Sequence, residues 1–86
     1  MGYRPSARQL EYFIALAEEG HFGKAAKKCH VSQPTLSNQF KLLEDSVHTT
    51  LVERGTTGVR LTAAGERLLP LARHALEVLD DFVTAA

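Results

Sequence analysis

The sequence lacks several features that would place it in a class at once. It has no tryptophan, one cysteine and no net charge at pH 7 among its 86 residues. A single cysteine excludes an internal disulfide, and no run approaches the roughly 20 apolar residues that span a membrane. The N-terminus also lacks the pattern of a secretory signal peptide. The chain is long enough for one small domain with a modest core, which we expect to work in the reducing cytoplasm.

Positive charge is concentrated in one stretch although the total is zero. Residues 21–43 contain no Asp or Glu, whereas most acidic residues lie before residue 20 or after residue 65. The lysines of this stretch are Lys24, Lys27, Lys28 and Lys41. A lysine run is usually only a solvated face, but a local cationic surface can bind phosphates on a neutral domain. We favour a phosphate role here because the lysines coincide with the motif that follows.

One stretch predicts a helix with two very different faces, which we place at residues 33–46. Ser32 is a suitable N-cap, because its hydroxyl can accept a hydrogen bond from an amide of the first turn. The apolar stripe of the helix is formed by Leu36, Phe40 and Leu43. The other face carries Gln33, Pro34, Thr35, Ser37, Asn38 and Lys41. These short donors and acceptors suit the base edges of the DNA major groove, although taken alone they also fit a polar surface helix.

A shorter helix is predicted just before it, at residues 22–29. Only His30 and Val31 separate this helix from the Ser32 cap, and helices joined by so tight a turn must cross steeply. Such a pair is a helix-turn-helix, whose second helix can enter a groove of DNA. Cys29 falls on the inward side of the short helix, and we interpret it as a buried thiol.

A hairpin is predicted after the helix-turn-helix. Two short β-prone runs, residues 49–54 and 59–61, flank a loop bounded by glycines, which is a hairpin signal. A hairpin in this position is the wing of a winged-helix domain.

Two arginines lie near the base of this predicted wing. Arg54 and Arg60 can contact phosphate or the minor groove from there. For Arg54 the alternative is an internal ion pair with Glu53 or Glu44, and we favour the contact with DNA.

The first helix is predicted at residues 7–19. Ser6 and Gln9 fit a capping box at its start, and Gly20 can adopt the left-handed conformation that ends it. Residues 1–5 are expected to form a short loose arm.

A last helix is predicted after Thr62, which is a suitable N-cap, and covers most of residues 62–86. Its apolar residues recur at spacings of three, four and seven and make a stripe broader than one small domain needs. Such a seam suits pairing with a second copy, and we expect it to be formed by Leu68, Ala72, Ala75, Leu76, Leu79, Phe82 and Val83. The alternative is a helix that packs only on its own domain. Pro70 removes one backbone hydrogen bond and is expected to kink the helix without ending it.

The predicted architecture is therefore mainly α. It is a winged helix-turn-helix with a two-stranded wing at residues 1–61, followed by a linker and dimerisation helix at residues 62–86. No Ser/His/Asp or Cys/His grouping lies on a recognisable catalytic scaffold, and the histidines lack ligand spacing, so we expect no enzyme, metal or cofactor. The leading interpretation is a dimeric, sequence-specific DNA binder, and the alternative is a winged-helix module for protein–protein contact.

Seven segments of the chain carry a family resemblance. They are Leu10–Phe13, Phe22, Ala25–Ala26, His30–Ser37, Leu43–Glu44, Leu51–Arg54 and Leu61–Gly65. Together they resemble the N-terminal DNA-binding domain of the LysR-type transcriptional regulators, over nearly all of the chain. The run from Cys29 to Ser37 is most similar to the peroxide-sensing OxyR branch of that family.

The resemblance implies a transcription factor that binds promoter DNA at an interrupted inverted repeat, as a homodimer through the linker helix. It implies that Ser32 contacts phosphate and that Arg54 holds phosphate beside the wing. It also implies major-groove contacts for Gln33, Pro34, Thr35, Ser37 and Asn38, with Lys41 near the DNA backbone. Family members carry a larger C-terminal effector domain, so we expect the chain to be a fragment of a longer protein that forms a higher oligomer.

Three departures from the family pattern stand out. His21 and Gly23 stand where relatives often have hydroxyl residues that touch phosphate. His48 stands where a glycine commonly closes the helix at 33–46, and a histidine can take the left-handed conformation only at a cost. The tip of the wing, residues 55–58, has no cation, so contact with the minor groove is expected to be weaker or to rest on Arg60.

Overall fold

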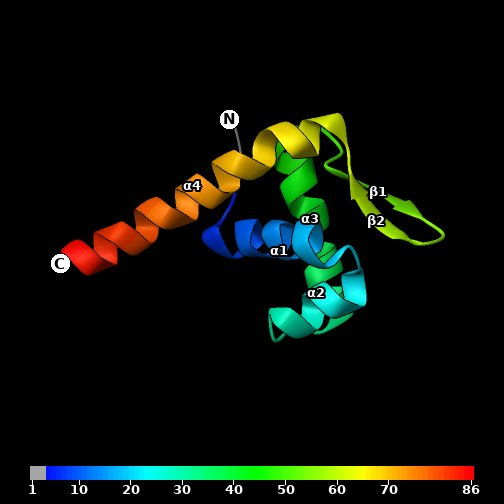
Figure 1. The fold of residues 1–86 in the computed structure, drawn as a ribbon, viewed down its shortest axis with the longest axis horizontal. Helices are drawn as coiled ribbons and strands as arrows, with labels where there is room; N and C mark the ends of the chain where they lie inside the picture. Colours follow the sequence, from blue (N-terminus) through cyan, green and yellow to red (C-terminus); the bar gives the residue numbers. More distant parts are fainter. Residues whose placement is uncertain (1–3) are drawn as a thin grey trace.

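A computed structural model describes residues 4–86, so most of the arm expected at residues 1–5 lies outside the described residues. The elements in chain order are α1 (Ala7–Glu19), α2 (Phe22–Lys28), α3 (Gln33–Val47), β1 (Val52–Gly55), β2 (Gly58–Leu61) and α4 (Ala63–Ala85). The first three helices form the body of the domain, the hairpin projects from one end of it and α4 from the other (Figure 1). The predicted fold, a mainly α winged helix with a two-stranded wing and a long last helix, is confirmed.

The helix starts follow the predicted caps. At α1 the Gln9 amide donates to Ser6 Oγ and the Ser6 amide donates to Gln9 Oε1, both at 3.1 Å, which is a complete capping box. The Thr35 amide donates to Ser32 Oγ at 3.2 Å, and the Gly65 amide donates to Thr62 Oγ1 at 3.0 Å. These side chains satisfy amides that have no partner within their own helix.

Both helices of the helix-turn-helix end in the same way, on a histidine with left-handed backbone. His30 has φ 59° and His48 has φ 54°. Beyond α2, the Val31 amide donates to the Ala26 carbonyl at 3.0 Å, and beyond α3 the Thr49 amide donates to the Glu44 carbonyl at 3.2 Å. These are Schellman closures. They end α2 at Lys28, one residue earlier than predicted, and α3 at Val47, one residue later.

The core forms where α1, α2 and α3 meet, and the predicted stripe of α3 is buried in it: Leu36, Phe40 and Leu43. The ring of Phe40 lies 6.0 Å from that of Phe13 on α1 and 6.4 Å from that of Phe22 on α2, centre to centre. Cys29 is buried at the end of α2, as predicted. Burial raises the pKa of its thiol, which therefore stays protonated at neutral pH.

The wing is shorter than its sequence pattern predicts. The strands are antiparallel, and β1 begins at Val52, not at residue 49, because residues 49–51 are held by the neighbouring helices. The Leu51 amide donates to the Glu44 carboxylate of α3 at 2.8 Å, and Thr62 Oγ1 donates to the Thr50 carbonyl at 2.7 Å. Strand β2 is fixed to the end of α1, because the Val59 amide donates to the Gly20 carbonyl at 2.9 Å.

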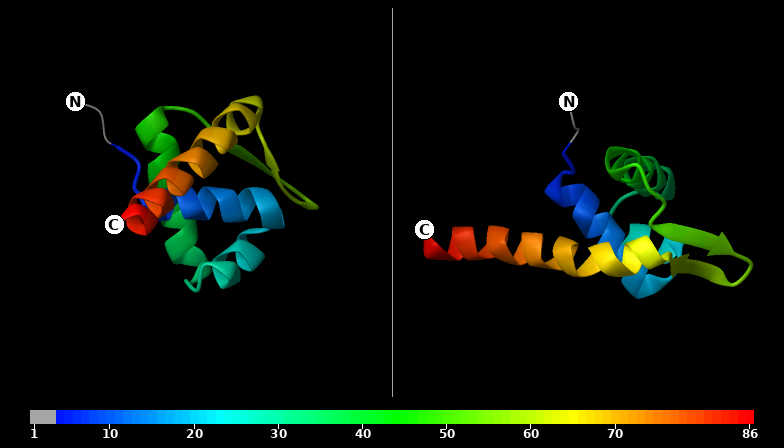
Figure 2. Two further views of the ribbon diagram at one scale, coloured as in Figure 1. Left: turned by 60° about the vertical axis from the view of Figure 1, so that its left-hand side comes forward. Right: turned by 90° about the horizontal axis from the view of Figure 1, so that it is seen from above.

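The two halves of α4 have different surroundings. Its first half packs on α1 and on the base of the wing, with Ala72 buried in the core and Gly65 buried against Leu51, and the helix continues through Pro70 without ending, as predicted. Its second half projects away from the rest of the domain, as the view from above shows most clearly (Figure 2). Within residues 4–86, no helix is apolar and long enough to cross a membrane.

Candidate nucleic-acid interface

The polar face of α3 lies on the surface of the molecule. Gln33, Pro34, Thr35, Asn38 and Lys41 are exposed, and Ser37 is half-buried. The opposite stripe of the helix is buried in the core, which fixes the direction in which this face points. A rigid helix that presents amide and hydroxyl groups outward has the chemistry needed to read base edges.

The first turn of α3 uses one of its hydroxyl groups internally. Ser32 Oγ accepts from the Thr35 amide at 3.2 Å and donates to Thr35 Oγ1 at 2.9 Å. In this arrangement the Thr35 hydroxyl proton is not used by the Ser32 side chain. Of the two residues, Thr35 is therefore the better placed to donate to an external acceptor.

Arg54 connects the wing with the two helices. Its guanidinium carbon lies 4.0 Å from the centre of the Phe22 ring, and Nη2 donates to Ser37 Oγ of α3 at 3.3 Å. The alternative of an ion pair with Glu53 or Glu44 is not what the structure shows. Glu53 is the neighbour of Arg54 in β1 and so points to the other face of the strand, and the Glu44 carboxylate accepts the amides of Leu51 and Val52. Phe22, the platform for Arg54, was named from the sequence only as part of the family pattern, since its spacing marks it as a core residue and not as a partner of Arg54.

Arg60 lies on the other face of the wing. In the register of the hairpin Arg54 faces Val59, whereas Arg60 faces Glu53. Successive residues of a strand point to opposite sides of the sheet. Since Arg54 contacts α2 and α3, Arg60 points away from them, so the two arginines predicted to contact phosphate or the minor groove lie on opposite faces of the wing.

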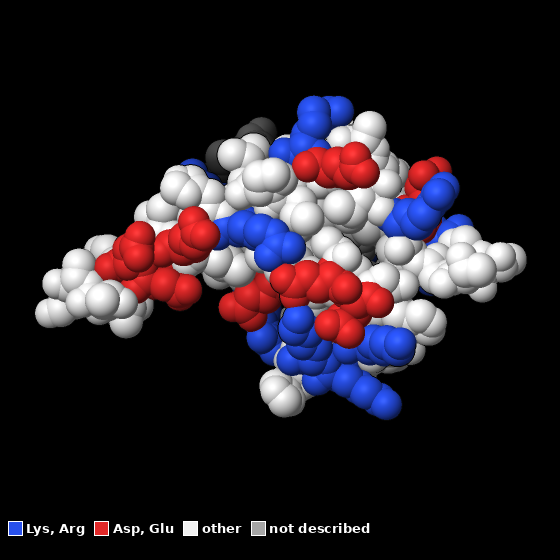
Figure 3. Space-filling model, in the orientation of Figure 1, with Lys and Arg blue, Asp and Glu red and all other residues white. Residues whose placement is uncertain are grey.

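The lysines differ in how far they are already engaged. Lys28 Nζ lies 2.5 Å from Glu18 and 3.5 Å from Glu19, and the Glu18 contact raises the pKa of Lys28. Lys41 lies 3.3 Å from Asp45, one turn further along α3. Lys24 and Lys27 make no ion pair with a carboxylate of residues 4–86. In Figure 3 a group of Lys and Arg side chains lies at the foot of the molecule, over α2, directly below a band of acidic residues.

The predicted dimer seam on α4 requires a correction. Ala72 is only 4% exposed and belongs to the core of its own domain, and Leu68 packs against that core. They are occupied because the first half of α4 covers α1, as the alternative interpretation of this helix proposed. Beyond them, Phe82 is 76% exposed and Val83 is 73% exposed. Leu71 and Val78, which lie outside the predicted seam, are 63% and 50% exposed.

Comparison with known proteins places this geometry in a family. Residues 7–66 match the family described as bacterial regulatory helix-turn-helix protein, lysR family. The DNA-binding transcriptional dual regulator OxyR of Escherichia coli is 52% identical over 69 residues, which is 80% of this chain and 23% of that protein. Relatives that are not OxyR proteins match with similar identity, so this domain alone does not single out the OxyR branch. The chain spans about a quarter of the length of the curated relatives it matches.

Solved structures agree over almost the whole chain. A mutant of OxyR from Corynebacterium glutamicum superposes with a TM-score of 0.93 at 43% identity and covers 98% of this chain and 27% of its own. A complex of the CbnR DBD with DNA gives a TM-score of 0.89 at 44% identity and covers 93% of this chain and 92% of its own. The chain therefore belongs to the LysR family of bacterial regulatory helix-turn-helix proteins.

Proposed function

We propose that this chain is the sequence-specific DNA-binding part of a LysR-type transcriptional regulator, with α3 in the major groove of promoter DNA. The observation that carries the proposal is the two-sided character of α3. Its stripe of Leu36, Phe40 and Leu43 is buried, while its opposite face exposes Gln33 and Asn38 to solvent. The CbnR DBD, which this chain resembles over 93% of its length, has been solved with DNA bound, and this supports the assignment.

Cations on both sides of α3 suit the two DNA strands that border a groove. Lys24 and Lys27 on α2 are exposed, and Arg54 reaches α3 from the wing. Contacts to phosphate fix the position of a protein on the duplex, and contacts to base edges supply the specificity. We assign the positioning role to these three cations and to Thr35, and the reading role to Gln33, Ser37 and Asn38.

We also propose that the domain dimerises through the second half of α4. Four residues form an apolar strip, the outer seam: the exposed Leu71, Val78 and Phe82 and the half-buried Ala75. Their spacings of four, three and four residues place them on one face of the helix. The strip lies beside the face that packs on α1, so α4 can bind its own domain and a second copy at the same time.

Charge favours an antiparallel pair. Arg67 and His74 flank the outer seam toward its start, and Asp81 lies seven residues beyond His74 on the same flank. An antiparallel arrangement sets Arg67 of one copy on the same side of the seam as Asp81 of the other, whereas a parallel one places this flank of the two copies on opposite sides of the seam. Opposite charges beside an apolar seam select the orientation of a helix pair.

For the whole protein, of which this chain is a part, we propose regulation of transcription in the cytoplasm by a higher oligomer. The domain itself can be tested by selection from a library of random-sequence duplexes, followed by binding measurements at several salt concentrations. We expect enrichment of an inverted repeat whose half-sites lie one or more helical turns of the duplex apart. We also expect the affinity to fall steeply as the salt concentration rises.

The role of Gln33 provides a second measurement in the same experiment. Gln33→Ala should cost about 1–3 kcal/mol on the selected duplex and relax the base preference at one position. An equal loss on random DNA would contradict a base-reading role. The absence of both enrichment and salt dependence would favour the rival function, a winged helix that docks on another protein.

A further inference from the structure

Gln9 of α1 is a polar side chain in the interior of the domain, where it is only 1% exposed to solvent. Among residues 4–86 no other polar side chain is buried to this extent. Its Oε1 atom accepts the Ser6 amide at 3.1 Å, and its Nε2 atom donates to Gln39 Oε1 of α3, also at 3.1 Å. Because a buried amide is costly unless it is hydrogen-bonded, the Gln9 side chain is held in this orientation, and it joins α1 to α3.

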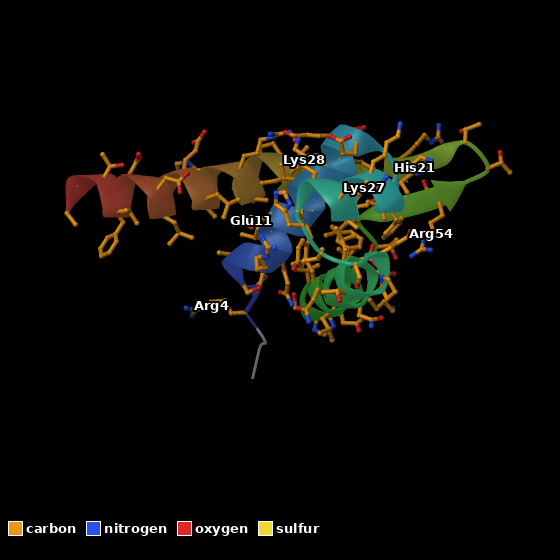
Figure 4. The ribbon with its side chains drawn as sticks, turned by 90° about the horizontal axis from the view of Figure 1, so that it is seen from below. Arg4, Glu11, His21, Lys27, Lys28 and Arg54 are labelled. Carbon is orange, nitrogen blue, oxygen red and sulfur yellow. The ribbon has the colours of Figure 1, made fainter. Side chains whose placement is uncertain are left out.

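Gln39 follows Asn38 directly on α3 and is half-buried. At 3.6 residues per turn, Gln39 and Ser37 lie on opposite flanks of the buried stripe of this helix. Ser37 Oγ accepts from Arg54 Nη2 of the wing at 3.3 Å. In the view from below, Arg54 lies toward the wing and Glu11 of α1 toward the opposite side, with α3 between them (Figure 4). Helix α3 is therefore hydrogen-bonded to another element on each flank.

These flanking hydrogen bonds restrain the rotation of α3 about its own axis. Apolar contacts have no directional preference, and an apolar core loses its unique arrangement before it loses stability. A rotation of about 10° moves side-chain atoms that lie about 5–6 Å from a helix axis by about 1 Å. Hydrogen bonds between nitrogen and oxygen tolerate a range of only about 0.5 Å, so a rotation of this size would disturb contacts between α3 and base edges.

We propose that Gln9 is a positioning residue for base recognition, which acts through its hydrogen bond to Gln39 and sets the rotation of α3 in the major groove. Gln9 is buried on α1, so it has no contact with DNA itself. The inference rests on the proposed function, since it requires α3 to read base edges. It gives the buried amide a role in specificity that the cap of α1 alone does not require.

The test compares two duplexes: the one selected with the wild-type chain and a random-sequence duplex. The ratio of the two affinities, measured by fluorescence anisotropy, reports base recognition, because phosphate contacts are common to both duplexes. Gln9→Met removes the hydrogen bonds of the amide and keeps a side chain of similar length. We expect the ratio to fall by at least about fivefold, the size of one lost base contact. The affinity for the random duplex should change by less than about twofold, because most of the proposed phosphate contacts come from α2 and the wing.

Ser6→Ala is the matched control for a loss of stability. It removes the hydroxyl that caps α1 but leaves the backbone amide of residue 6 and the bond between Gln9 and Gln39 in place. It should lower the midpoint of urea unfolding and leave the ratio of affinities at the wild-type value. An equal fall of the ratio in Ser6→Ala and Gln9→Met would assign the effect to stability and overturn the inference.

Two substitutions of Gln39 test the same bond from the side of α3. Gln39→Met removes the acceptor of the bond and should lower the ratio as Gln9→Met does. Because this position is half-buried, the variant also provides the test if Gln9→Met does not fold. Gln39→Glu keeps an acceptor for Gln9 Nε2. Its negative charge should weaken binding to both duplexes, while their ratio stays within about twofold of the wild-type value.

The outcomes distinguish this inference from the proposed function. If the wild type prefers the selected duplex and a folded methionine variant keeps that preference, the inference alone is overturned. A loss of the ratio in Gln39→Glu as large as that in Gln39→Met would also overturn it, because the bond would then not be what matters. If selection with the wild type enriches no duplex, the proposed function and the inference fail together.

Discussion

The guanidinium carbon of Arg54 lies 4.0 Å from the centre of the Phe22 ring, so a residue of the wing is stacked on the first residue of α2. Phe22 in turn packs edge-on against Phe40 in the core. The position of the wing is therefore tied to the packing of the helix-turn-helix. Arg54 combines a stabilising contact with a cation that is directed at the predicted DNA surface.

These two roles of Arg54 can be measured separately. Arg54→Ala removes both, and should lower the free energy of unfolding by about 0.5–1 kcal/mol through the lost stacking. Arg54→Met keeps much of the packing on Phe22 but not the charge. It should therefore recover part of the stability in urea unfolding, while both variants weaken binding to duplex DNA and flatten its salt dependence. DNA binding that recovers in Arg54→Met would show that the charge is not what matters.

Gly65 is predicted to tolerate no side chain. A Cβ at this position would collide with the backbone carbonyl of Leu51, which is held by the Thr62 amide at 3.0 Å and cannot easily move. Gly65→Ala should lower the free energy of unfolding by about 1–3 kcal/mol, the range for overpacking. The matched control is Gly55→Ala, whose Cβ would lie 3.7 Å from the Gly58 carbonyl, an ordinary contact. Equal urea midpoints for the two variants would contradict the close approach.

The outer seam predicts which substitution on α4 separates the dimer. Val78→Asp places a charge in the seam without touching the core and should give monomers in sedimentation, because a carboxylate is costly in an apolar contact. Thr84→Asp adds the same charge on the opposite face of the same helix and should leave the dimer intact. If Thr84→Asp also separated the copies, a different face of α4 would form the interface.

Glu18 links three helices and gives the fold a predicted dependence on pH. Its carboxylate lies 2.5 Å from Lys28 of α2 and 3.0 Å from Arg73 of α4, and these contacts, that with Lys28 above all, hold the pKa of Glu18 below its ordinary value. A lowered pKa means that the stabilisation is present above the pKa of the unfolded chain, about 4.3, and is lost as the pH falls through the folded value.

Glu18→Gln should therefore be less stable than the wild type at pH 7, by no more than about 1 kcal/mol for a largely exposed group. The difference should be smaller at about pH 3, below the ordinary pKa of glutamate, and should vanish only once the folded-state carboxylate is itself protonated. Chemical unfolding at both pH values measures this, with Glu53→Gln on the outer face of the wing as the control. A difference that is the same at both pH values would assign the effect of Glu18→Gln to packing, not to charge.

Local features of the fold were the ones that sequence could predict. Ser6, Ser32 and Thr62 act within a turn of their own helix, so residue type and spacing are sufficient to identify them. The same holds for Gly20 and for His48, whose left-handed backbone was expected from its place at the end of a helix.

Contacts between distant elements were harder to predict. Stacking of Arg54 on Phe22 depends on how the wing folds back onto α2, and no periodicity of the sequence indicates this position of the wing. The register of the hairpin, which sends Arg60 away from α3, depends on where the strands begin. Residues 49–51 look like strand, but Glu44 takes two of the amides in this region.

The seam on α4 shows a further limit of periodicity. A stripe of apolar residues indicates that a face is covered but not what covers it. Helix α4 has two apolar faces side by side, and the spacing of apolar residues in the sequence does not distinguish one face from the other. Burial of Ala72 beside exposure of Leu71 separates the face that belongs to the domain from the one left for a second copy.

The second half of α4 projects from the domain, so a small change of angle at its base displaces its C-terminal end by a larger distance. From Arg73, the last residue held by an ion pair to α1, to Ala85 the helix extends about 18 Å at 1.5 Å per residue. A tilt of about 10° of α4 about the Arg73–Glu18 ion pair would displace its C-terminal end by about 3 Å. This is close to the 3.4 Å, measured along the helix axis of DNA, that separates neighbouring phosphates of one strand. In the proposed dimer, the angle of α4 at this ion pair would thus set the distance between the two copies of α3 to within a single base pair.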